Sequence, residues 1–305
     1  MRRRLMSMTL TLLAVVSLAS CHYKDFDEDF LDSAPVRIVA DWQGADFRPG
    51  LRLVICPLDG QYQRPYVVDM KDSVNLRLPV GHYRIVAFNS SSDILRVTGL
   101  DDLSGNVEIH TDPADVSKLA CLDTVPHSTL YDYPDRTMAG RTWTATVRKD
   151  VALNRILIPV KETTVPVNIV IRGIRHLEYI NTAVFTLDNC NLAYYPAADS
   201  VGKRLVTLVS YDSKIDIAHG AVSNSFQTFG FSPKDSHVIW IGLTGEGYGT
   251  VLRYDVDPEN LSVNGDGNIT IHLDTDFDIR TIIPKGSSFT VGVDKWREDS
   301  VDIEM

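Results

Sequence analysis

The strongest constraint on the fold of this 305-residue chain is the alternation of apolar and polar side chains with a period of two. In an extended strand, this period places apolar groups on one face and polar groups on the other. One-sided strands of this kind bury their apolar faces against each other in sandwiches, so the sequence predicts an all-β protein. The alternating apolar positions are Val36, Ile38 and Ala40; Leu51, Leu53 and Ile55; Val74, Leu76 and Leu78; Tyr83, Ile85 and Ala87; Val167, Ile169 and Ile171; Ile269, Ile271 and Leu273; Phe289, Val291 and Val293; and Val301, Ile303 and Met305.

Turn signals separate these segments, because Gly and Asn tolerate the positive φ that tight turns need. They are "LDGQ" at 58–61, "LPVG" at 78–81, "GEGYG" at 245–249 and "NGDGN" at 264–268. The glycine-rich "GLTGEGYGT" superficially resembles a phosphate-binding loop. It lies between two β-type runs with no helix to receive a phosphate, so we expect a hairpin. One short helix is predicted over 114–120, after Asp112-Pro113.

The length of the chain favours two domains. The boundary is expected in "LIPVKETTVPVN", where Pro159 and Pro166 bracket a polar stretch before a new alternating run begins. We therefore predict an N-terminal β-sandwich over 35–161 and a C-terminal β-sandwich over 162–305.

The first twenty residues read as a lipoprotein signal peptide. Three arginines at 2–4 precede an apolar stretch at 5–18 that is too short to span a bilayer as a helix. The stretch ends in Leu-Ala-Ser-Cys, which matches the bacterial lipobox, so Cys21 is the predicted lipidation site. The alternative is an ordinary secretory signal with a chance cysteine. A diacylated cysteine would anchor the mature chain in the outer membrane without a transmembrane helix.

An acidic tether over 21–34 follows, with five acids and one lysine in "HYKDFDEDFLD". It resembles the surface-export signal of Bacteroidetes lipoproteins, which implies a cell-surface location. Removing residues 1–20 takes away three arginines, so the formal charge changes from −10 to −13. Nucleic acid and anionic surfaces are therefore unfavourable partners.

No catalytic or cofactor-binding pattern emerges, and we predict that the protein is not an enzyme and has no cofactor or metal site. Cys56, Cys121 and Cys190 allow at most one disulfide and lack metal-ligand spacing. Asp274, Asp276 and Asp278 could collect Ca²⁺, but a solvated acidic strand edge explains them equally well.

Two further sets of residues bear on surface chemistry. We expect the tryptophans to fill the core, although exposed ones could form a sugar-binding platform; they are Trp42, Trp143, Trp240 and Trp296. Asp-Ser/Thr followed by a small or aliphatic residue resembles the acceptor of O-glycosylation in Bacteroidetes. This resemblance makes Ser33, Thr124 and Ser200 candidate glycosylation sites.

The chain also resembles a protein family over nearly all of its mature length. "SVNLRLPVGHYRIVAFN" and "VRIVADW" are similar to the first domain of the fimbrillin-related lipoproteins of Bacteroidales. "VNIVIRGIRHLEYI", "SFQTFGFSP", "VIWIGLTGEG" and "FTVGVDKWREDSVDIEM" resemble the second domain of that group, which is related to FimB-type minor fimbrillin anchors. The resemblance implies two tandem transthyretin-like Greek-key sandwiches.

Two functions remain open on these grounds. The resemblance implies an anchor or accessory subunit of fimbria-like (type V pilus) fibres, held by acylated Cys21 and joined to fimbrillin subunits by β-strand addition. The alternative is a glycan-binding surface lipoprotein of a nutrient-uptake system, which would be marked by exposed tryptophan pairs.

Overall fold

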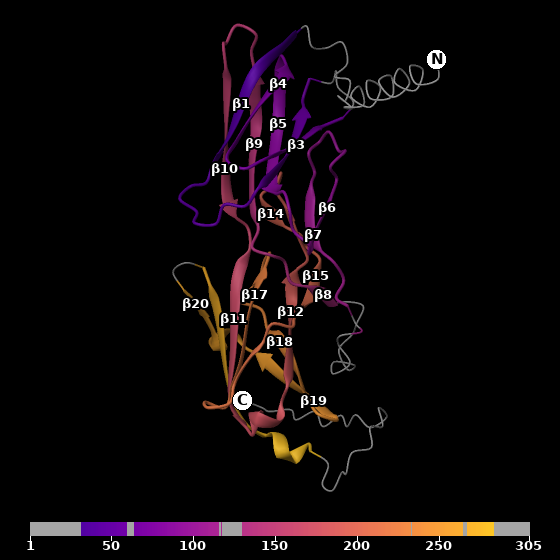
Figure 1. The fold of residues 1–305 in the computed structure, drawn as a ribbon, viewed down its shortest axis with the longest axis vertical. Coiled ribbons are helices and arrows are strands. Elements are labelled where there is room, and N and C mark those ends of the chain that lie inside the picture. The colour runs from indigo at the N-terminus through magenta and orange to yellow at the C-terminus, as the bar shows by residue number, and fades with distance from the viewer. Residues whose placement is uncertain are drawn as a thin grey trace, which may run out of the picture.

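The computed structural model describes residues 32–59, 64–115, 117, 130–232, 234–264 and 267–283. Its regular structure is strand with three single 3-10 turns, and no α-helix occurs in these ranges. Two β-sandwiches lie end to end along the long axis of the molecule (Figure 1). The 3-10 turns are η5 (Leu177–Tyr179), η6 (Pro258–Asn260) and η7 (Ile279–Thr281).

The N-terminal sandwich is formed by one continuous sheet of seven strands in the order β3-β2-β5-β9-β10-β1-β4. The sheet bends into two layers at β10, which pairs with strands of both layers. Residues 154–159 of β10 run parallel to β1, whereas residues 160–162 pair with β9. Two facing layers result, named sheet A (β4-β1-β10) and sheet B (β3-β2-β5-β9). The strands are β1 (Ser33–Asp41), β2 (Leu51–Pro57), β3 (Tyr66–Met70), β4 (Ser73–Pro79), β5 (Gly81–Asn89), β9 (Met138–Val147) and β10 (Asn154–Glu162).

The C-terminal sandwich repeats this topology. In sheet E, β11 pairs parallel with β21 and antiparallel with β17, as β1 does with β10 and β4. Sheet D has the order β15-β12-β18-β19, which corresponds to β3-β2-β5-β9. The strands are β11 (Val165–Arg175), β12 (Thr182–Asn191), β15 (Leu205–Ser210), β16 (Lys214–Asp216), β17 (Ala221–Thr228), β18 (His237–Gly245), β19 (Tyr248–Val256), β20 (Leu261–Val263) and β21 (Ile269–Asp278).

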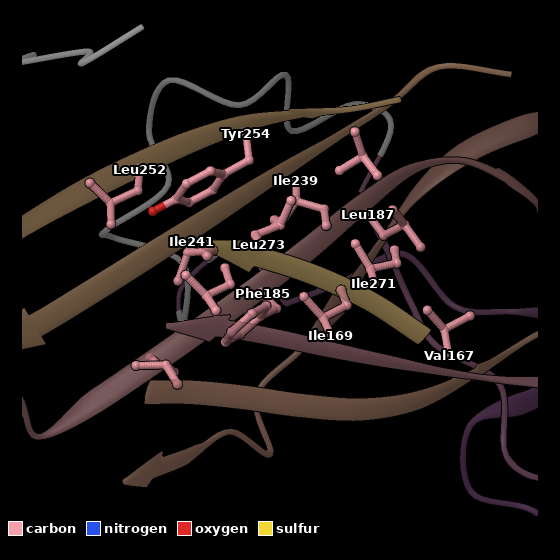
Figure 2. Close-up of a cluster of buried hydrophobic side chains, with 14 of the residues drawn as sticks. Val167, Ile169, Phe185, Leu187, Ile239, Ile241, Leu252, Tyr254, Ile271 and Leu273 are labelled. Atoms are coloured by element: carbon pink, nitrogen blue, oxygen red, sulfur yellow. The ribbon is translucent and has the colours of Figure 1, made fainter. Parts of the chain in front are cut away.

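The period-two pattern explains both cores. Along β10, every second side chain is buried, from Asn154 to Val160. Figure 2 shows the C-terminal core, where Ile169 and Ile271 of sheet E face Phe185, Ile239 and other apolar residues of sheet D. The predicted all-β fold of tandem transthyretin-like Greek-key sandwiches is confirmed.

A third sheet joins the two halves of the chain. Sheet C has the order β14-β13-β7-β6, in which β7 comes from the first half and β13 from the second. It packs on the outer face of sheet B through a cluster that includes Phe88, Ile109, Tyr194 and Phe229. In addition, β8 (Leu130–Asp132) extends sheet D beside β15. The strands of sheet C are β6 (Leu95–Thr98), β7 (Glu108–Thr111), β13 (Ala193–Tyr195) and β14 (Ser200–Val201).

The boundary predicted at 161/162 falls at the end of β10, before β11 opens a new sheet. Strands β7 and β8 nevertheless cross from the first half into sheets that contain strands of the second. The division into two independent folding units stays a prediction.

Some local expectations were met and others were not. The glycine-rich segment is the β18–β19 hairpin turn, as predicted. Trp42 is buried and Trp240 half-buried, but Trp143 is 51% exposed, so the expectation of a core position was wrong for that residue. It lies where a bulge interrupts the β5–β9 register, which turns the ring outward.

The predicted helix at 114–120 falls mostly outside the described residues, and the strands at 289–293 and 301–305, with Trp296, fall wholly outside them.

Candidate strand-addition edges and anchoring end

The predicted anchor, Cys21, lies outside the described residues, but the structure fixes the point where the tether reaches the fold. Asp32 is held by two turns: its carbonyl accepts the Val80 amide hydrogen at 2.9 Å. Its carboxylate contacts Lys149 Nζ at 2.6 Å. The tether therefore joins the end of the molecule formed by the β4–β5 and β9–β10 turns, which is the top in Figure 1.

The candidate glycosylation sites differ in their surroundings. Ser33 is buried, and its hydroxyl accepts a hydrogen bond from Arg77 Nε at 3.2 Å. Ser200 is exposed on β14, next to Asp199. Thr124 lies outside the described residues. Modification of any of the three stays a prediction, and Ser200 is the more accessible of the two hydroxyls that the structure places.

Strand addition needs an unpaired strand edge with a free row of backbone groups. Comparison of the two sandwiches identifies such edges, because their core strands correspond one to one. In the C-terminal sandwich, β8 covers the edge of β15, β16 covers that of β17, and β20 covers that of β21. Each covering strand pairs with three residues of its neighbour, at 207–209, 221–223 and 269–271, so these three edges are closed in part.

The strand β19 ends sheet D, and no other strand of the described ranges pairs with its outer edge. Its counterpart β9 is tied to β10 at both ends of the hairpin: residues 138–140 pair with 160–162, and Asn154 hydrogen-bonds the backbone of Arg148 near the turn. In the described chain, no backbone pairing joins β19 to β21. The outer edge of β19 is therefore uncovered by the residues that the structure describes.

The geometry of β19 suits an acceptor strand. All nine of its residues pair in register with β18, so its backbone is held extended. The core-facing side chains of Thr250, Leu252 and Tyr254 are buried, and burial raises the pKa of the Tyr254 phenol above its usual value. On the outer face Arg253 and Asp255 form an ion pair at 2.5 Å. The backbone of β19 is thus held in the extended conformation that strand addition would require.

The bare edges of the N-terminal sandwich are shorter. Strand β3 has five residues and β4 has seven, and they are neighbours across a turn that contains Asp72. Asp72 is tied to β1 and to Trp42, whose indole nitrogen donates to its carboxylate at 3.1 Å. By length, β19 is the strongest candidate, and alternation alone could not have identified it because a paired strand shows the same pattern.

The exposed tryptophan does not form an open sugar platform of paired rings. The guanidinium groups of Arg84 and Arg141 lie over the ring of Trp143, at 5.1 and 4.6 Å from its centre. The other two tryptophans in the described chain are buried or half-buried. The tryptophan pair that would mark a glycan-binding surface is thus missing from the described ranges.

The two described cysteines are buried in the core, and two of the three aspartates near the end of β21 form ion pairs. Cys56 and Cys190 are free and buried in different clusters, and burial raises the pKa of the Cys56 thiol to about 11. Asp276 and Asp278 contact Arg175, and Asp278 also contacts Arg280. In the ranges that the structure describes, no group of three His, Cys, Asp or Glu side chains is placed to hold a metal ion. Nor does any helix there have the length and apolar character needed to cross a bilayer.

Comparison with solved structures finds a similar fold. A candidate adhesin from Bacteroides ovatus superposes with a TM-score of 0.60 at 16% identity, over 80% of this chain and 93% of that one. The fimbrial anchor protein Mfa2 from Porphyromonas gingivalis gives a TM-score of 0.46 at 13% identity, over 68% and 77%. No curated protein sequence matches the chain.

The resemblance expected from the sequence is confirmed at the level of family and fold. The sequence model of the family described as Domain of unknown function (DUF5119) matches residues 20–210, which is more than half of the chain. The protein therefore belongs to the DUF5119 family.

Proposed function

We propose that this protein is a surface lipoprotein, anchored in the outer membrane through acylated Cys21, that serves as an anchor or accessory subunit of a fimbria-like fibre. It would bind a neighbouring fimbrillin-type subunit by β-strand addition. The observation that carries the proposal is the nine-residue edge of β19, which no strand of the described ranges covers. Nine extended residues span about 30 Å, which is long enough for a partner strand to form a full ladder.

The position of this edge supports the proposal. The chain enters the fold at the top of Figure 1, whereas β19 begins at the opposite end, where Asn181 after η5 contacts the β18–β19 hairpin. An anchored molecule of this shape presents β19 away from the membrane. The fold shared with a candidate adhesin is consistent with a binding role rather than catalysis. The glycan-binding alternative has less support, because the ring of the exposed Trp143 is covered by two guanidinium groups.

The test is gel electrophoresis of outer-membrane extracts, boiled and unboiled, from cells that produce proline variants at successive positions of 249–255. Backbone N–H groups of an edge strand point alternately toward its partner and outward. Subunits joined by strand addition should run in unboiled samples as a ladder of oligomer bands that boiling removes. Proline at outward positions should abolish this ladder of bands and leave the monomer folded. Proline at inward positions should destabilise β18–β19 pairing.

Loss of these oligomer bands at every second proline position along β19 supports strand addition at this edge. Ladders that survive every outward proline place the contact elsewhere, and a single monomer band from the native protein, boiled or unboiled, refutes fibre assembly.

In the same extracts, Cys21→Ala should move the protein from the membrane pellet to the soluble fraction without unfolding it. A Cys21→Ala protein that stays in the pellet would refute lipid anchoring.

A further inference from the structure

Exposed aliphatic side chains gather at the end of the molecule where the tether joins it. Leu58, Val80, Val151 and Leu153 are 36–42% exposed. They lie on three turns, at the end of β2, between β4 and β5, and between β9 and β10. We call these four residues the apolar tip.

Strand register brings the three turns together. Gly81, next to Val80, pairs with Val147 at the end of β9, just before the turn that carries Val151 and Leu153. The Leu58 amide donates to the His82 carbonyl at 2.8 Å, which places the end of β2 beside the start of β5. The apolar tip is therefore one surface built by three segments distant in sequence.

The charges at the apolar tip are nearly balanced, in contrast to the acidic molecule as a whole. Lys149 pairs with Asp32, and His82 lies 3.2 Å from Asp59. Arg148 and Asp150 are exposed beside them. The long stems of Arg148 and Lys149 can lie along apolar surface while their charged ends reach lipid phosphates. The apolar tip itself therefore presents little net charge to a lipid surface, in contrast to the acidic tether that joins it.

The tether limits where the apolar tip can be. Only ten residues, 22–31, lie between Cys21 and Asp32, so the tether spans at most about 40 Å when it is fully extended. A lipid on Cys21 would thus keep the apolar tip within a short distance of the bilayer, and exposed aliphatic side chains are stabilised at the boundary between headgroups and acyl chains.

We propose that the apolar tip rests on the lipid bilayer and forms a second, non-covalent contact with the membrane. This inference depends on the lipid anchor of the proposed function. Docking at the apolar tip points the long axis of Figure 1 away from the membrane and holds the β19 edge at the outer end. A tether alone would leave the molecule free to lie flat.

The experiment uses the full lipidated protein in vesicles of phosphatidylcholine and phosphatidylglycerol that contain nitroxide-labelled lipids. An environment-sensitive fluorophore is attached at Val151→Cys, in a background with Cys121→Ser. Cys56 and Cys190 are buried and should not react. The matched control is Ile217→Cys, an aliphatic residue 57% exposed after β16, at the other end of the C-terminal sandwich.

We expect blue-shifted, quenched emission from position 151 and unchanged emission from position 217. A second variant with Val80→Asp and Leu153→Asp should lose the quenching at 151 and still float with the vesicles. Equal emission at 151 and 217 in floating protein overturns the tip contact and leaves lipid anchoring intact. Failure of the protein to float with the vesicles refutes the anchor itself, and with it the basis of this inference.

Discussion

At the residue scale, Asp199 connects the two halves of the molecule. It accepts a hydrogen bond from Tyr194 in the same hairpin and contacts Lys161 of β10 at 2.8 Å, while Arg141 of β9 lies 3.9 Å away. The hydrogen bond from Lys161, followed by that from Tyr194, holds the pKa of Asp199 below its usual value. Its φ of 52° is a conformation that Asp and Asn tolerate better than most residues.

This arrangement predicts a pH-dependent effect of Asp199→Asn. A carboxyl whose pKa is lowered in the folded state adds stability above its unfolded pKa of about 3.9, and that stability is lost as pH falls through the folded value. We expect a loss of roughly 1 kcal/mol at pH 7, because the group is partly exposed. The difference from the native protein should shrink below about pH 4.

Urea unfolding at several pH values measures this effect. Asp101→Asn is the control, because Asp101 is exposed in a turn. A cost at pH 7 that is equal for both variants, or that does not change with pH, would contradict the role assigned to the Asp199 carboxylate.

At the element scale, the parallel pairing of the first and last core strands of the C-terminal sandwich contains an irregularity. The β11–β21 register shifts between Arg172 and Ile174. Gly173 lies there with a φ of 85°, and a Cβ atom would come within 1.7 Å of the Thr275 carbonyl oxygen. The bulge therefore requires glycine both for its backbone conformation and for the close approach of β21.

Comparison of two alanine variants separates these requirements. Gly44 has a nearly equal φ of 83°, but a Cβ atom added there would have no neighbour within 4 Å. Gly44→Ala should cost about 1 kcal/mol of backbone strain. Gly173→Ala should cost roughly 1–3 kcal/mol more, because β11 and β21 must move apart. Chemical denaturation of both proteins would show this, and equal losses would mean that the bulge can relax without cost.

At the scale of the whole molecule, sheet C makes the two sandwiches one structure. Tyr194 and Phe229 come from the second half of the chain, and their rings stack at 6.5 Å within the cluster that covers sheet B. Arg141 of β9 also donates to the Ala197 carbonyl. Because apolar area and hydrogen bonds join the halves, we expect them to unfold together.

Phe229→Ala tests this coupling. Removing a buried phenylalanine side chain typically costs roughly 3–5 kcal/mol, and here the loss falls on the junction. Calorimetry should show the single transition broaden or split into two. Phe226→Ala, in the core of the C-terminal sandwich alone, should lower that transition without separating the halves. A single sharp transition in Phe229→Ala would show that the two halves remain coupled without the Phe229 side chain, which contradicts the role assigned to it.

The amino-acid sequence by itself determined that the fold is all-β and that one-sided strands recur in both halves of the chain. The period of two at residues such as Ile169 and Ile271 dictates one-sided strands, and turn chemistry at "GEGYG" places a hairpin, because both depend on local geometry. Only the tertiary structure decided which strands pair with which. The crossing of β7 and β8 into sheets with strands of the second half and the outward turn of Trp143 depend on contacts between residues far apart in sequence. So does the position of β19 at the edge of its sheet in the described ranges. An edge strand and a covered strand carry the same alternation, so the surface on which the proposed function depends had no local signal.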